Sequence, residues 1–296
     1  QHMNQPAYEF YLNRNPGIDL AADRLEIGVC AQHNNGGIDV DLWWRSSIAG
    51  LFPVGEAAGA HGVARPGGAA LNSAQVGATR AAQWIAAREQ GAARADEGWQ
   101  ELAGDALQKA RSLLEAACGR EESSGVLIDD VLMESTRAMS DNAGLVRSRQ
   151  GLEELARNVA EWRRRVVDEC VVDPTSRRSV DRLFLVRDIL DVQAVYVAAM
   201  LDHLDHGVGS RGSVLYTDPD GDLPVSWWND GADLDVEEIF RHRLDSKAHH
   251  GVTQRVSVDA VGEAIHAHWG PVRPIPTEDE FLENVWKTYR VDHNIH

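Results

Sequence analysis

Residues 32–41, QHNNGGIDVD, and residues 50–71, GLFPVGEAAGAHGVARPGGAAL, form the stretch that decides the fold. A helix of small residues continues from it to Ala82. The pattern predicts a strand, a tight glycine turn that brings bare backbone against a ligand, and a helix whose N-terminus faces that ligand. Such a site suits a flat or anionic molecule.

The overall charge excludes some partners. The chain of 296 residues has 29 basic and 46 acidic residues, a net charge of −17. This balance argues against a surface for nucleic acid or for an anionic membrane, whereas a small anion can still bind where a few Arg and His side chains converge. The length allows two domains or one large one.

Cysteine usage and hydropathy indicate the compartment. Cys30, Cys118 and Cys170 are widely spaced and odd in number, so they offer neither a disulfide framework nor a CxxC motif. No apolar run reaches the roughly 18 residues of a membrane span, and no leader-like segment opens the chain. We therefore expect a soluble cytoplasmic protein, peripheral to a membrane only through a partner. Gln1-His2-Met3 resembles a cloning remnant and is left out of the fold prediction.

Short extended segments are predicted before residue 60. Residues 4–24 are polar and turn-rich, so we expect an irregular entry segment. Alternating apolar and polar residues predict a strand from Leu25, a second strand over 38–44 after Gly36-Gly37, and a third over 51–54.

Helices dominate the remainder. The Ala- and Gly-rich residues 67–88 predict a helix packed close to a sheet or a ligand, with Gly91 beyond its end. Apolar residues spaced three and four apart predict four bundle helices, near 99–114, 126–139, 152–166 and 179–204. The fold class is therefore α+β and mostly helical, with a domain boundary near Gly91.

The last ninety residues are less regular. Residues 216–224, YTDPDGDLP, are typical of a turn cluster, and 235–244 of a short helix. Residues 207–212, GVGSRG, match a dinucleotide-binding pattern, but that fingerprint needs a preceding strand and a following helix. Here a helix precedes and turn residues follow, which favours a glycine-rich helix terminus and loop.

Histidine pairs suggest metal ligands only weakly. His203 and His206, next to Asp202 and Asp205, have ligand-like spacing, but histidines at a helix C-terminus also favour the dipole on a solvated tip. No third ligand lies at a telling distance, so we favour the solvated tip. His249-His250 and the His266-x-His268 pair are judged in the same way, and no metal site is predicted.

Polar residues in the opening stretch stand out more. His33 precedes a glycine turn, Glu56 follows Val-Gly, and Arg65 lies between small residues and a Gly-Gly pair. One interpretation is a tight β-turn-α unit with surface His and Arg. A functional site is the preferred interpretation, because loops with such polar groups often carry function.

These motifs resemble the flavoprotein family of fumarate reductases and succinate dehydrogenases, which includes aspartate oxidase. The family shows HxMGGI, then GLYAxGE, then HGANRLGGNSLxxAxxxGRxAA. This chain has HNNGGI at 33–38, GLFPVGE at 50–56 and HGVARPGGAAL at 61–71, followed by Arg80-Ala81-Ala82. Order, spacing and residue type agree over some fifty residues.

The resemblance implies an FAD site and catalytic residues. His33 is similar to the histidine that binds a substrate carboxylate, and Arg65 to the arginine that clamps a carboxylate beside the flavin. Glu56 corresponds to the acid that hydrogen-bonds the ribityl or ribose region of FAD. The remaining cofactor-binding positions are contributed by backbone at Gly36, Gly37, Gly55, Gly67, Gly68, Ala69, Ala70 and Leu71. The implied reaction is hydride transfer between flavin N5 and a C–C bond activated by a carboxylate or carbonyl.

Departures from the family pattern affect the substrate. Asn34-Asn35, Pro66 and Ala69-Ala70 replace family residues that touch flavin or substrate, so the substrate need not be fumarate or succinate. Downstream, Ser210-Arg211-Gly212 and Asp218-Pro219 match the family's SRGAHxRxDYP only in part. Val214 and Tyr216 occupy the places of its His and second Arg.

The resemblance also implies a domain organisation. The family's ADP-binding GxGxxG unit and its capping domain precede the His motif, and this chain shows neither. We therefore expect the C-terminal portion of such a flavoprotein, inactive alone and poor at holding FAD. Its parts would be a return segment of a split FAD-binding domain (4–91), a helical bundle domain (92–206) and an irregular α/β tail packed on the bundle (207–296).

The expected partners follow from that organisation. They are a small carboxylate or enoate-like substrate, the N-terminal part of the same flavoprotein and an electron-transfer partner. The alternative from another class is a non-catalytic module whose helices dock a partner subunit.

Overall fold

The structure is a computed structural model, and the chain divides into two compact units, residues 1–33 and 34–296. The residues that it describes are 5–23, 36–59, 69–88, 98–121, 125–211, 214–225, 235–259, 264–272, 277–278 and 280–292.

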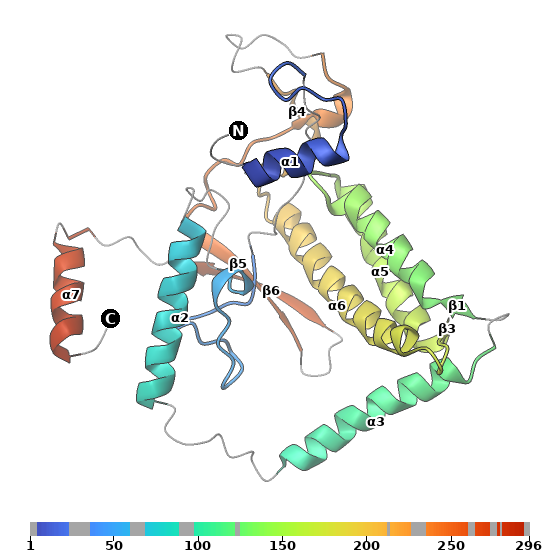
Figure 1. Cartoon of the computed structure of the whole chain (residues 1–296). Helices are drawn as coiled ribbons and strands as arrows, with labels where there is room; N and C mark the ends of the chain where they lie inside the picture. Colours follow the sequence, from blue (N-terminus) through green and yellow to red (C-terminus); the bar gives the residue numbers. More distant parts are fainter. Residues whose placement is uncertain are drawn as a thin grey trace. The chain divides into compact units, whose positions relative to one another are not determined.

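The first unit contains α1, Gln5–Arg14 (Figure 1). The prediction of an irregular segment over 4–24 is therefore wrong for these ten residues. The helix buries no side chain, so no apolar stripe marks it in the sequence, and a hydrogen bond from Gln5 Nε2 to Glu9 Oε1 (2.8 Å) links one turn. It ends just before Asn15-Pro16-Gly17, where Gly17 takes the left-handed conformation. The strand predicted from Leu25 lies outside the described residues.

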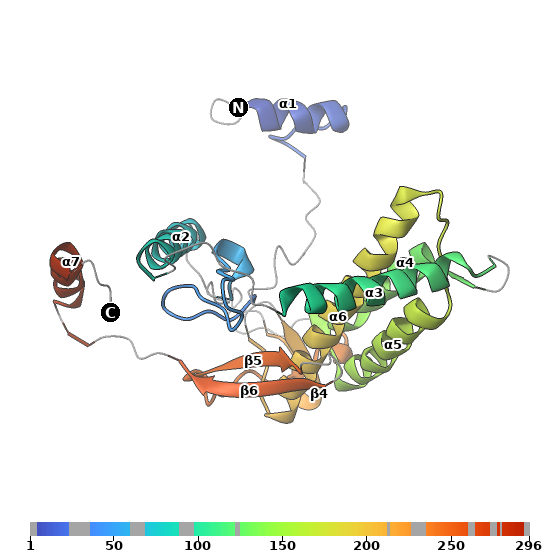
Figure 2. The same cartoon turned by 90° about the horizontal axis from the view of Figure 1, so that it is seen from below.

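Four long helices follow in the second unit, as the apolar spacing predicts. They are α3 (Trp99–Cys118), α4 (Ile128–Ala143), α5 (Arg149–Asp168) and α6 (Arg177–Asp205). Two serines cap helix starts: Ser148 Oγ accepts from the Gly151 N–H (3.0 Å), and Ser176 Oγ from the Ser179 N–H (3.3 Å). Helices α4, α5 and α6 pack on one another (Figures 1 and 2).

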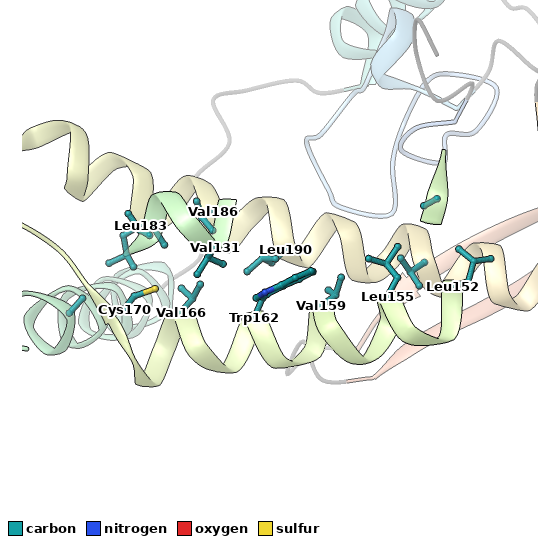
Figure 3. Close-up of a cluster of buried hydrophobic side chains, with 14 of the residues drawn as sticks. Val131, Leu152, Leu155, Val159, Trp162, Val166, Cys170, Leu183, Val186 and Leu190 are labelled. Carbon is teal, nitrogen blue, oxygen red and sulfur yellow. The ribbon is translucent and has the colours of Figure 1, made fainter. Parts of the chain in front are cut away.

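The hydrophobic core lies between these helices. Figure 3 shows one face of α5, where the side chains point toward α6 at spacings of three and four residues. This face consists of Leu152, Leu155, Val159, Trp162 and Val166. Opposite it lie Leu183, Val186 and Leu190 of α6, and Val131 of α4 adds a third side. Burying each such side chain contributes roughly 1.5–3 kcal/mol, which makes this cluster the main source of stability among the described residues.

Two very short parallel pairings join the ends of the helices. β1 (Val126–Leu127) pairs with β3 (Cys170–Val171), and β2 (Val146–Arg147) pairs with the start of β4 (Leu215–Asp222). Cys170 is fully buried, and its burial raises the pKa of its thiol to about 11. Cys118 and Cys170, the two cysteines in the described part of the chain, are free thiols.

The tail differs from the prediction in several places. Residues 216–222 of the predicted turn cluster lie in β4, although turn chemistry persists inside it: Asp218 Oδ1 accepts from the Asp220 N–H (3.0 Å). Thr217 and Asp222 both bridge to His242, so this strand pairs around the turn rather than ending at it. The helix predicted over 235–244 is only the 3₁₀ turn η2, Glu238–Phe240.

Three further elements complete the tail. β5 (Val252–Val258) and β6 (Ile265–Pro271) form an antiparallel pair, which Figure 2 shows side by side. The last helix is α7, Phe281–Asp292. None of these three is in the sequence prediction. The fold is a mostly helical α+β arrangement, as predicted.

Candidate functional site

The helix of the motif stretch is α2, Ala69–Arg88. The predicted helix over 67–88 is confirmed from Ala69 onward. Its small residues let other segments approach closely, since Gly77 and Ala81 are its buried positions. Ala69, Ala70 and Leu71 form its first turn, where backbone N–H groups lack intrahelical partners.

Residues 36–59 form turns rather than the two predicted strands. Residues 38–44 and 51–54 contain no strand beyond an isolated parallel bridge between Ile38 and Ala58. Asp41 is the reason for the first difference: its Oδ1 accepts from the N–H groups of Trp43 (2.8 Å) and Arg45 (3.0 Å). A side chain that bonds nearby backbone in this way favours a turn over a strand.

The Ile38–Ala58 bridge joins the end of the first family motif to the residues that directly follow the second. The Ile38 N–H donates to the Ala57 carbonyl (2.8 Å), and the Gly59 N–H donates to the Ile38 carbonyl (3.2 Å). The contact requires glycine at position 37, because a Cβ added there would lie 2.5 Å from the Ala57 carbonyl oxygen. Gly36-Gly37 is thus held beside Gly55-Glu56.

Gly55 and Glu56 begin the 3₁₀ turn η1, Gly55–Ala57, which packs against α2. Gly55 has a φ of 64°, in the region that favours glycine, and a Cβ added to it would lie 3.7 Å from Cβ of Ala74 on α2. The Glu56 side chain is exposed. The turn therefore brings its acid and backbone near the first two turns of the helix.

The structure describes only part of the predicted site. It brings together Gly36, Gly37, Gly55 and Glu56, next to the helix that begins at Ala69, Ala70 and Leu71. His33, Arg65, Gly67 and Gly68 lie outside the described residues. The helix from Ala69 agrees with the expected pattern, the strands expected over 38–44 and 51–54 do not form, and the assignment of roles stays a prediction.

An aromatic contact that sequence reasoning missed holds this segment on α2. The rings of Trp43 and Trp84 are 5.5 Å apart, and the Arg45 guanidinium lies 4.1 Å from the Trp84 ring centroid. The available signal was the Trp43-Trp44 pair together with a single Trp on an otherwise small-residue helix.

Asp41 and Arg45 close the turn between the two glycine motifs. Arg45 Nη2 lies 2.6 Å from Asp41 Oδ2. Partial burial disfavours ionisation of Asp41, but hydrogen bonds from Arg45 and from the Trp43 backbone outweigh it and hold the pKa of this carboxyl below its usual value. The carboxylate is therefore charged at neutral pH.

The second, partial motif has a structural role. Ser210 is buried, and its Oγ accepts from the Tyr216 N–H (2.8 Å). Arg211 Nη1 lies 3.4 Å from Oδ2 of Asp245, a carboxylate that also contacts His250 Nε2 at 3.1 Å. Gly207 ends α6 with a φ of 66°, so residues 207–211 form a helix terminus and loop, as predicted, rather than a dinucleotide-binding turn.

The histidines at the end of α6 are not a simple solvated tip. His203 lies in an edge-on contact with Trp269 of β6, at 5.3 Å, and desolvation together with Arg211 lowers its pKa to about 4. Asp202 Oδ2 accepts from Trp269 Nε1 (2.8 Å) and from Gln254 Nε2 (2.6 Å). The hairpin thus covers this helix end, and the prediction of full solvation is wrong for His203.

The described residues contain neither a metal-binding cluster nor a membrane-spanning helix. In those ranges, no group of three or more His, Cys, Asp or Glu side chains is arranged to hold a metal ion. Over the same part of the chain, no helix has the length and apolar character needed to cross a membrane.

The comparison with known proteins gives one sequence relative and several structural ones. No family model matches the chain. Over 66 residues, 22% of this chain, it is 39% identical to a fumarate reductase (CoM/CoB) subunit of Methanothermobacter marburgensis. That segment spans 12% of the relative.

Solved structures share the fold over a larger part of the chain. A variant of the E. coli quinol fumarate reductase chain FrdA matches 83% of this chain with a TM-score of 0.59 and 20% identity. A quinol-fumarate reductase with menaquinol molecules matches 94% with a TM-score of 0.64 and 20% identity. The chain covers 38% and 43% of those two chains. The sequence match and the shared fold together confirm the resemblance of this chain to flavoproteins of the fumarate reductase and succinate dehydrogenase type.

Proposed function

We propose that this chain is the C-terminal portion of an FAD-dependent oxidoreductase that transfers hydride to or from a C–C bond next to a carboxylate or carbonyl. The observation that supports the proposal best is the Ile38–Ala58 bridge, which holds Gly36-Gly37 beside Gly55-Glu56 on α2. Those are the positions at which the family motifs surround the flavin.

The residues present suit a flat cofactor with many hydrogen-bonding groups. Among the described residues, a Cβ added to Gly36 would meet no heavy atom within 4 Å, which leaves room there for an approaching ring. The N–H groups in the first turn of α2 have no partner within the helix and can donate to carbonyl or phosphate oxygens. The exposed Glu56 carboxylate can accept from a ribityl or ribose hydroxyl. When bound, FAD would supply the hydride chemistry.

Arg65 and His33 would bind and polarise the substrate. An arginine engages a carboxylate through two parallel N–H donors, and a neighbouring histidine adds a further donor. Both groups stabilise negative charge that develops as hydride moves. The substrate would be a small carboxylate or an enoate-like acid, and electrons would reach the flavin through a separate partner.

Exposed apolar side chains suggest that the motif segment, residues 36–59 and 69–88, packs against other parts of an FAD-binding domain. Several large apolar residues between 38 and 85 are exposed, and Leu71 is 71% exposed. The group consists of Ile38, Ile48, Leu51, Val54, Leu71, Val76 and Ile85. Other parts of an FAD-binding domain would cover these side chains in the full-length protein. The isolated chain would therefore hold FAD weakly and have no turnover.

Titration with FAD tests this function. We expect the isolated chain to change flavin absorbance or fluorescence only at high FAD concentration, and the full-length protein to bind FAD stoichiometrically. Tight, stoichiometric binding by the isolated chain would contradict the proposed division of the site, and failure of the full-length protein to bind FAD would contradict the function itself.

A substitution in the full-length protein tests the role proposed for Arg65. Arg65→Ala should lower kcat about 10²- to 10³-fold, the usual loss for one donor to developing charge. Arg65→Lys keeps the charge but not the paired donors and should recover only part of the rate. Arg177→Ala is the control, because the Arg177 side chain on α6 is 94% exposed and lies outside the proposed site. Unchanged turnover in Arg65→Ala would remove this residue from its role.

A non-catalytic docking module is the second candidate, and one observation favours it. Met133 of α4 and both Leu185 and Val192 of α6 remain exposed on the bundle. Under this alternative the full-length protein would bind a partner subunit but would neither bind FAD nor oxidise or reduce a carboxylate substrate.

A further inference from the structure

Trp44 holds an unusual backbone conformation between the two glycine motifs. Its φ is 59°, in the left-handed region that bulky side chains rarely adopt. The turn around it is closed by the Trp44 N–H, which donates to the Asp41 carbonyl (3.1 Å), and by the Asp41 N–H, which donates to the Arg45 carbonyl (3.0 Å). A strained residue persists only where its surroundings hold it, and such residues cluster at functional sites.

The surroundings that hold Trp44 lie on α2. The Trp44 indole packs so closely on Gly77 that a Cβ added there would lie 2.5 Å from both its Nε1 and its Cε2. Gly77 is buried in the middle of α2, where glycine is otherwise unfavourable. The absence of a side chain at Gly77 therefore leaves the space that the Trp44 indole occupies.

Neighbouring contacts follow the same face of α2. Trp84 is seven residues after Gly77, two helical turns along, and it contacts Trp43. The guanidinium of Arg80 lies 5.1 Å from the Trp43 ring centroid, between those two positions. Trp43 and Trp44 thus attach the turn to α2 at successive points.

We propose that this tryptophan clamp, formed by Trp43 and Trp44 on Gly77 and Trp84, positions the Gly36-Gly37 and Gly55-Glu56 backbones relative to the start of α2 for cofactor binding. The two glycine motifs lie on either side of the clamped turn, and η1 packs on α2 one turn before Gly77. Trp43 and Trp44 act through the backbone that they hold, so they are positioning residues. The inference rests on the proposed function.

Two glycine-to-alanine variants test the clamp. Gly77→Ala displaces the Trp44 indole from its position on α2. Amide hydrogen exchange in a peptide covering 36–59 should therefore quicken at least tenfold. Gly104→Ala is the matched control, because a Cβ at that α3 position meets no heavy atom within 4 Å. It should leave exchange over 36–59 unchanged. Unchanged exchange in Gly77→Ala would overturn the clamp.

A second-site change and a flavin readout separate positioning from simple packing. Trp44→Leu should make the added alanine tolerable, so the double variant should show no further rise in exchange over Trp44→Leu alone. In the FAD-loaded full-length protein, Gly77→Ala should weaken FAD binding at least tenfold and shift the flavin absorption band, with Gly104→Ala unchanged. Altered exchange with unchanged affinity and spectrum would overturn the positioning role. If the unmodified full-length protein bound no FAD, the proposed function would fail, while the exchange data would still report on the clamp.

Discussion

His203, near the C-terminal end of α6, shows how one residue couples charge to packing. Its ring contacts those of Tyr216 and Trp269, and the attraction of the Asp202 carboxylate does not offset its loss of water. Desolvation, reinforced by Arg211 and Arg147, lowers its pKa to about 4, against an ordinary value near 6.5. The folded protein therefore keeps this imidazole neutral.

The free energy of unfolding should consequently fall as the pH falls from about 6.5 to about 4. In this window His203 is protonated in the unfolded chain but not in the folded chain. The stabilisation present above pH 6.5 is therefore lost toward pH 4. One such proton gives a slope of no more than about 1.4 kcal/mol per pH unit. Urea unfolding at pH 7, 6, 5 and 4 measures it.

His203→Gln should flatten that part of the profile. His266→Gln is the control, since His266 lies on an exposed position of β6. The difference between the two variants isolates His203 from the many carboxylates that also titrate below pH 5. An identical pH profile for both variants would show that His203 is not the group responsible.

The sequence predicts that His203 lies at the end of a helix, but it does not predict the surroundings of the imidazole. The spacing of His203 and His206 correctly places them at the end of a helix. The solvent exposure of His203 depends on Trp269, sixty-six positions later, which no local pattern connects to it. The tryptophan clamp could not be predicted from the sequence for the same reason, because Trp44 and Gly77 come into contact only in the folded segment.

At the scale of elements, the Asp202 carboxylate of α6 binds both strands of the β5–β6 hairpin. Asp202 accepts hydrogen bonds from Trp269 of β6 and from Gln254 of β5, and its side chain is only 21% exposed. Gln254 Nε2 also donates to the Ala199 carbonyl (2.9 Å). A second link joins the hairpin to the motif segment, where Arg255 Nε lies 2.9 Å from Asp39 Oδ2.

Asp202→Ala should loosen the hairpin. The indole and amide donors would lose their shared acceptor in a partly buried place, at a cost of about 1–3 kcal/mol. Amide exchange in β5 and β6 should quicken while α5 stays protected. Asp205→Ala is the control, because the ion pair of Asp205 with Arg149 is exposed and worth about 0–1 kcal/mol. Equal exchange in both variants would mean that Asp202 does not fasten the hairpin.

Helices were easier to predict than strands in this chain for a physical reason. The helices α3 to α6 bury one face in a common core, so their apolar residues repeat every three to four positions in the sequence itself. The segments 38–44 and 51–54 share the composition of strands, but Asp41 forms a turn in the first of them, and the second is followed directly by the 3₁₀ turn η1 at Gly55. β5 does carry an alternating pattern, yet its partner and its support on α6 come from elsewhere in the chain.

For the candidate site, the motifs predict the helix that is observed from Ala69 onward, and they contain the two glycines, Gly37 and Gly55, whose close contact or conformation requires glycine. They cannot fix how this segment is held, since that depends on aromatic packing outside the motifs.

Across the whole molecule, buried side chains are distributed very unevenly. Nearly all the large buried apolar residues described lie between 117 and 216, in the helices α3 to α6 and the short strands beside them. In the motif segment, over residues 36–59 and 69–88, the buried apolar residues are the small Ala58 and Ala81, with Pro53 beside them. The helices α3 to α6 therefore share a hydrophobic core, whereas the motif segment buries few apolar side chains of its own.

Two leucine truncations should differ accordingly. Leu152→Ala removes a fully buried side chain from α5 and should lower the free energy of unfolding by about 2–5 kcal/mol. Leu71→Ala removes one that is 71% exposed on α2 and should change it by no more than about 0.5 kcal/mol. Urea unfolding followed by far-UV circular dichroism compares them. Similar losses in both variants would contradict this distribution of the core.

The two short parallel pairings have a consequence for the order in which the bundle is built. β1–β3 closes a loop that contains α4 and α5, and β2–β4 closes one that contains α5 and α6. The loops overlap in α5, so the conformational entropy spent in closing one is partly shared by the other. Each pairing is too short to persist by itself and must form together with the helix contacts that it encloses. A chain that docks α5 correctly gains both closures, and one that misplaces α5 loses both, which makes assembly of the three helices a cooperative event centred on α5.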